Sequence, residues 1–105
     1  MSVQMNIKWQ PAIQRGCLTI DPQRYTVVLA GKEIDLYPKE FDVLYLLVQY
    51  PGWVLSPEQI YESVWQGDMT GCEHVVYNVI CQLRRKLKNP DMIQTVVGRG
   101  YKFVG

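Results

Sequence analysis

The hydrophobic pattern of this chain changes its period at Pro38, and that change limits the folds open to it. Residues 17–36 alternate apolar and polar side chains around turn residues such as Ala30-Gly31, which predicts short antiparallel strands. From Pro38 onward, apolar side chains recur at helical spacing. Because 105 residues enclose one core but not two, the sequence predicts one α+β domain with its sheet first.

We place this domain at residues 16–105. Residues 1–15 show no clear period and are predicted to be a leader or linker remnant, with or without a first strand.

Three helices are predicted after the sheet. The first begins at Pro38, because proline suits a first helical position, and ends at Pro51-Gly52. The second begins after Ser56, which can cap it, with Gln59 placed to complete a capping box. The third covers roughly residues 73–88.

The third predicted helix has two different faces. One is a narrow apolar stripe that belongs in the core, formed by Val76, Ile80, Leu83 and Leu87. The opposite face is polar or cationic, with Cys81 beside it, and carries His74, Asn78, Gln82 and Arg85. Amide and cationic side chains on one exposed face suit a polar, negatively charged partner.

A terminal β-hairpin is predicted at residues 92–104, after Asn89-Pro90 ends the last helix. Its turn holds Arg99 between two glycines, so the arginine projects outward. Arg99 is either ordinary solvated charge or a contact for something negative. Because the hairpin follows a polar and partly basic helix face, we favour the contact.

The charge distribution supports a basic face. The net charge of +1 argues weakly against a nucleic-acid partner. However, residues 82–102 have one acid, Asp91, against six cations: Arg84, Arg85, Lys86, Lys88, Arg99 and Lys102. We expect Arg84 to pair with Glu40 on the first helix. Arg85 and Lys88 are better candidates for phosphate contacts, with ordinary solvated charge as the alternative.

Several classes of protein are not expected. No apolar run approaches the ~20 residues of a membrane helix, and the N-terminus lacks a signal peptide, so we expect a cytoplasmic protein. The three cysteines form neither a CxxC pair nor a cluster with histidine, which predicts no metal and no cofactor. No nucleophile–base pair is recognisable, so no catalytic residue and no enzyme activity is expected.

The predicted order of strands, three helices and a hairpin is that of a winged helix-turn-helix. In that class the last helix enters the DNA major groove, ~12 Å wide, and the hairpin, or wing, reaches the backbone or the minor groove. The alternative is a protein-interaction module, because winged helices also serve as docking folds. The apolar Val75 and Val79 beside the polar face favour that alternative slightly.

Four segments, LYPKEF, SPEQIYESVW, VVYNVICQLRRKL and TVVGRGYKF, together resemble the OmpR/PhoB-type effector domain of bacterial two-component response regulators. The resemblance covers about residues 17–104. It implies an N-terminal antiparallel sheet, a three-helix core and a C-terminal β-hairpin wing. It also implies sequence-specific binding to tandem repeats in double-stranded promoter DNA, by domains that are monomers in isolation and associate on DNA.

The resemblance also implies residue roles. The recognition helix would read bases with Val75, Asn78, Val79 and Gln82. The DNA backbone or minor groove would be met by His74, Arg85, Lys88, Arg99 and Lys102. The loop that touches RNA polymerase in some members corresponds to Gln66, Gly67, Asp68, Met69, Thr70 and Gly71.

Three departures from the family pattern bear on these roles. Many relatives carry a basic residue where this chain has Val97, so Arg99 is the only arginine at the wing. The position of Gln82 is often arginine in relatives, and its glutamine here suggests a different base pattern, such as adenine read by Gln82 or Asn78. Tyr37 replaces a Ser or Thr cap before Pro38, which should cost about 1 kcal/mol unless another group caps there.

A receiver domain does not fit into this chain. The chain is then an excised output domain, a stand-alone regulator of the same fold, or part of a membrane-tethered relative.

Overall fold

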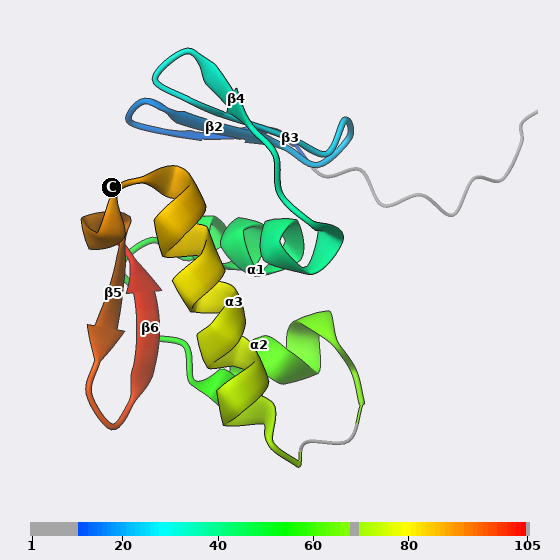
Figure 1. The fold of residues 1–105 in the computed structure, drawn as a ribbon, viewed down its shortest axis with the longest axis vertical. Helices are drawn as coiled ribbons and strands as arrows, with labels where there is room; N and C mark the ends of the chain where they lie inside the picture. Colours follow the sequence, from blue (N-terminus) through cyan, green and yellow to red (C-terminus); the bar gives the residue numbers. More distant parts are fainter. Residues whose placement is uncertain (1–10, 68–69, 105) are drawn as a thin grey trace, which may run out of the picture.

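The structure is a computed structural model that describes residues 11–67 and 70–104. Four strands are followed by three helices, a short 3₁₀ turn and two strands (Figure 1). Their bounds are β1 (Ile13–Arg15), β2 (Leu18–Asp21), β3 (Thr26–Leu29), β4 (Lys32–Ile34), α1 (Pro38–Gln49), α2 (Pro57–Val64), α3 (Cys72–Leu87), η1 (Pro90–Met92), β5 (Ile93–Val96) and β6 (Gly100–Phe103). This order confirms the predicted winged-helix class.

The N-terminal strands form an antiparallel sheet in the order β1-β2-β3-β4, which lies against the side of the helices nearest α1 (Figure 1). Leu18 and Ile20 of β2 and Val27 of β3 are buried on one face of the sheet, as expected for a sheet with one face in the core. The sheet already begins at Ile13, before the predicted domain start at residue 16. Most of the predicted leader, residues 1–10, lies outside the described residues.

The helices and the hairpin share one core. Val76, Ile80, Leu83 and Leu87 of α3 are all at most 2% exposed, so the predicted stripe is confirmed. They belong to the same buried cluster as Val43, Leu44, Leu47 and Val48 of α1, and Ile93 and Phe103 of the hairpin. The side of α3 that stays open to solvent is therefore the one that this stripe leaves outside.

The starts of α1 and α2 are both capped. At α2, Ser56 Oγ accepts from Gln59 N at 3.0 Å and Gln59 Oε1 accepts from Ser56 N at 2.8 Å, which confirms the predicted capping box. At α1, Tyr37 supplies no hydroxyl cap, but its backbone N–H donates to Glu40 Oε1 at 2.9 Å. Glu40 thus binds a backbone N–H at this helix start, where Tyr37 makes no side-chain cap.

The hairpin is joined to the helices through its inner strand, β6. Between α1 and α2, Leu55 N donates to Tyr101 O at 2.8 Å and Tyr101 N donates to Leu55 O at 2.9 Å. Gly52 N donates to Phe103 O at 2.9 Å. β6 is therefore held on one side by β5 and on the other by the α1–α2 connection, which fixes the wing relative to the helices.

The predicted Arg84–Glu40 pair is wrong. Glu40 accepts from Lys86 Nζ at 2.6 Å, whereas Arg84 Nη2 donates to Ile93 O at 2.8 Å and to Thr95 Oγ1 at 2.7 Å. Residues two apart on a helix point about 200° apart around its axis. Lys86 therefore leaves α3 toward α1, and Arg84 leaves it toward the hairpin.

Candidate nucleic-acid interface

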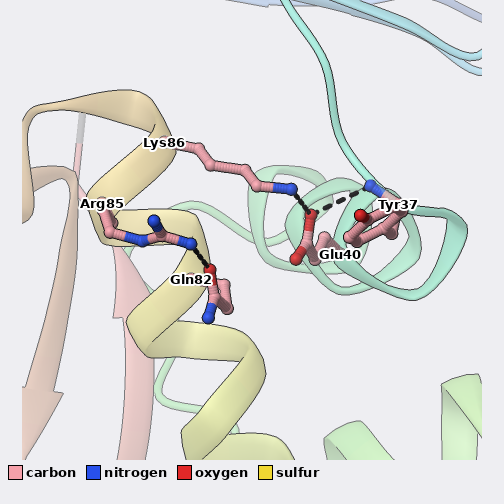
Figure 2. A network of polar contacts seen from close by, with 5 residues as sticks. All are labelled: Tyr37, Glu40, Gln82, Arg85 and Lys86. Atoms are coloured by element: carbon pink, nitrogen blue, oxygen red, sulfur yellow. Dashed lines mark hydrogen bonds and ion pairs between the residues drawn. The ribbon is translucent and has the colours of Figure 1, made fainter.

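The face of α3 opposite its core stripe is exposed along the helix. His74, Asn78, Gln82 and Arg85 all lie on the surface, about three turns from first to last. Asn78 makes no side-chain hydrogen bond with any residue that the structure describes. Arg85 Nη2, by contrast, donates to Gln82 Oε1 (Figure 2). On this face, the Gln82 amide oxygen is therefore occupied by Arg85, whereas the Asn78 amide has no partner among the described residues.

Val75 and Val79 lie at the border of this face. Both are half-buried, and Val79 packs against the hydrophobic core. Their positions on the helix place them on the side that faces α1 and α2.

Arg99 stands at the tip of the hairpin. Its N–H donates to Val96 O at 2.9 Å, which closes the turn, and Gly98 in that turn has φ +76°, which favours glycine. Arg99 is exposed, and neighbouring Val97 is 89% exposed. The tip therefore presents one cation and one apolar side chain.

The hairpin tip and the N-terminal end of α3 lie at the same end of the molecule, away from the N-terminal sheet (Figure 1). An open groove of about 540 Å³ separates them. It is lined from α3 by Glu73, His74 and Tyr77 and from the hairpin by Val96, Arg99 and Tyr101. The structure thus brings His74 and Arg99 together on one concave surface, and Glu73 places an acid among them.

Tyr77 is the residue that sequence reasoning missed. It is 50% exposed and lines the groove. A side-chain hydrogen bond with Cys81, then the charge of Cys81 and burial, raise the pKa of the Tyr77 hydroxyl above its ordinary value. The signal was its place three residues after His74, between the core stripe and the polar face.

The remaining predicted cations occupy two other places. Lys88 is exposed at the end of α3, on the same helix as Arg85. Lys102 is half-buried on β6, opposite Gln94 of β5. Because its neighbours Tyr101 and Phe103 face the core, Lys102 faces the other side of the hairpin, and the structure does not place it in the groove with Arg99.

Arg84 ties the hairpin to α3. Besides its contacts with Ile93 and Thr95, its guanidinium carbon lies 6.0 Å from the centre of the Tyr101 ring. A second polar contact between elements joins Lys86 of α3 to Glu40 of α1 (Figure 2). These two contacts hold α3 between the hairpin and α1.

The loop before α3 is described in part. Gln66, Gly67, Thr70 and Gly71 are exposed, whereas Asp68 and Met69 lie outside the described residues. Within residues 11–67 and 70–104, no three His, Cys, Asp or Glu side chains are grouped to hold a metal ion. No helix in these same ranges is long and apolar enough to cross a membrane.

Comparison with known sequences agrees with this geometry. Residues 31–103 match the family described as "Transcriptional regulatory protein, C terminal". The chain is 41% identical over 93 residues to the transcriptional regulatory protein CutR of Streptomyces coelicolor, covering 89% of this chain and 43% of CutR. It is 39% identical over 93 residues to the response regulator protein PmrA of Pseudomonas aeruginosa, covering 87% and 41%. The chain thus spans less than half the length of these relatives.

Two solved structures are also similar. The RstA DNA-binding domain of Klebsiella pneumoniae, in complex with the RstA box, has 30% identity and a TM-score of 0.82, covering 90% of this chain and 98% of that one. The DNA-binding domain of CpxR from E. coli has 33% identity and a TM-score of 0.81, covering 91% and 98%. This chain therefore belongs to the OmpR/PhoB-type family of transcriptional regulatory C-terminal domains.

Proposed function

We propose that this domain binds double-stranded promoter DNA sequence-specifically and regulates transcription as the output domain of a two-component response regulator. The observation that carries the proposal is that His74, at the start of the exposed polar face of α3, and Arg99 of the wing line one groove at one end of the molecule. The DNA complex of the RstA domain supports it. A helix ~10–12 Å across fits the ~12 Å major groove.

In this proposal Asn78 and Gln82 read base edges, with Val75 and Val79 in apolar contact at the border of the face. His74, Arg85 and Lys88 meet phosphates along α3, and Arg99 enters the minor groove or contacts its backbone. A wing in a narrow groove has phosphates on both sides, so Lys102 meets a phosphate from the opposite side of the hairpin.

The proposal extends to the assembled regulator. The domain is a monomer alone, associates on tandem DNA repeats in the cytoplasm, and offers residues 66–71 to RNA polymerase.

The competing function is that of a protein-docking module. A random-sequence binding selection at moderate salt separates them, because enrichment of a direct repeat supports the regulator and no enrichment supports docking.

Replacing Arg99 by alanine should weaken duplex binding for all sequences and flatten its dependence on salt. Each phosphate that a cation neutralises contributes about one unit to the log–log slope. The measurement is the dissociation constant over a salt series. The matched control is Arg24→Ala in the β2–β3 turn, whose side chain is 81% exposed and which should leave the slope unchanged. Equal effects of the two substitutions would contradict the role of Arg99.

Asn78→Ala should act differently, by relaxing the preference at one base pair. A well-formed side-chain contact to a base edge discriminates by ~1–3 kcal/mol, so the loss should be confined to sites that carry the preferred base there. The measurement is affinity for a set of single-base-pair variants of the selected site. A uniform loss over the whole set, of the kind expected for Arg99→Ala, would count against base reading.

A further inference from the structure

We infer that Arg85 sets which base Gln82 reads, by holding its amide so that Gln82 favours guanine over adenine. The inference rests on the proposed function and assigns Arg85 a positioning role in specificity beyond phosphate contact. It starts from the hydrogen bond from Arg85 Nη2 to Gln82 Oε1 on the exposed face of α3 (Figure 2).

The chemistry of the two groups fixes the orientation of the amide. A guanidinium has hydrogen-bond donors and no acceptor, so the Gln82 atom that faces Arg85 must be the oxygen. Residues three apart lie on the same side of a helix, so the contact forms within α3 and needs no other element. The Nε2 group, with its two donors, is then the part of Gln82 left for a partner.

This orientation disfavours the usual reading of adenine by glutamine. That reading needs the amide oxygen to accept from adenine N6 while the amide nitrogen donates to N7. The oxygen is already engaged by Arg85, and the guanidinium beside it would oppose the N6 donor. Guanine offers two acceptors, O6 and N7, and no donor at this edge. Both the Gln82 amide nitrogen and the positive charge of Arg85 therefore favour guanine.

Asn78 provides an internal comparison one turn away. Its amide has no side-chain hydrogen bond among the described residues, so its oxygen and nitrogen both remain for a base. Asn78 can therefore make the two-point contact with adenine that Gln82 cannot. The preferred site should contain a guanine opposite Gln82 and an adenine opposite Asn78.

The experiment is a base-by-base affinity series on the site that the wild-type chain selects from random duplex DNA. The position read by Gln82 is the one at which Gln82→Ala removes the preference. At that position the wild type should prefer guanine to adenine by about tenfold or more. Arg85→Met keeps the length of the side chain and removes its donors, so it should abolish the guanine preference or turn it toward adenine.

The matched control is Lys88→Met, which removes a neighbouring cation that does not contact Gln82. It should lower affinity equally for all variants of the site and keep the guanine preference. The inference is overturned if the wild type prefers adenine at the Gln82 position, if Gln82→Ala changes no position, or if Arg85→Met acts as uniformly as Lys88→Met. In each case selective binding persists and the proposed function stands. If no sequence is selected at all, the proposed function itself fails.

Discussion

Gly100→Ala is expected to lower the free energy of unfolding by about 3 kcal/mol or more, as severe overpacking does. A Cβ on Gly100 would lie 2.0 Å from Leu55 O, 2.7 Å from Leu55 C and 2.9 Å from Ser56 Cα. All three are backbone atoms, so no side-chain rotation relieves the clash. β6 would have to move away from the α1–α2 connection and lose the paired hydrogen bonds between Leu55 and Tyr101. Urea unfolding followed by circular dichroism measures the loss.

Gly98→Ala is the control for this result. Gly98 has a positive φ, +76°, but a Cβ there would meet nothing within 4 Å. Its cost should be that of placing an L-residue in the left-handed region, about 1–2 kcal/mol. If the two variants are equally stable, the close approach of β6 to Leu55 does not hold the wing.

Lys86→Met should destabilise the domain by about 3 kcal/mol, the lower end of the range for breaking a buried ion pair. Glu40 is 5% exposed, and Lys86 Nζ lies 2.6 Å from its carboxylate, so removing the cation leaves a buried charge without its partner. The ammonium also lies 4.3 Å from the centre of the Tyr37 ring. The lower end applies because the Lys86 side chain is 23% exposed and Glu40 keeps its bond from Tyr37 N.

A second substitution tests the cause. Glu40→Gln in the Lys86→Met background should recover much of the loss, because a neutral amide oxygen still accepts from Tyr37 N while no charge remains buried. Denaturant unfolding of the single and double variants gives the coupling energy. Arg24→Met, which breaks an exposed pair of 3.8 Å with Asp21, should change stability by less than about 1 kcal/mol. Additive effects of Lys86→Met and Glu40→Gln would refute the buried-charge explanation.

Much of the exposed surface of α3 follows from its sequence. The apolar period fixes which side is buried, so the solvent side of His74, Asn78, Gln82 and Arg85 follows from geometry within one helix. The apolar period of α3 does not show which neighbouring element lies beside each edge of its exposed face. The sequence therefore predicts Arg84 as the partner of Glu40, where the structure has Lys86, and it leaves open whether Tyr77 lines the groove.

The sequence by itself determined the strands after residue 16, the helices, the capping box of Ser56 and Gln59, the core stripe of α3 and the outward position of Arg99. These depend on contacts between residues close in the chain, whose spacing sets the angle at which each side chain leaves its element. The tertiary structure alone decided that Lys86 reaches Glu40, that Arg84 joins the hairpin, and that Gly100 lies against Leu55. Such contacts depend on how separate elements pack, and many packings share one pattern of buried and exposed residues.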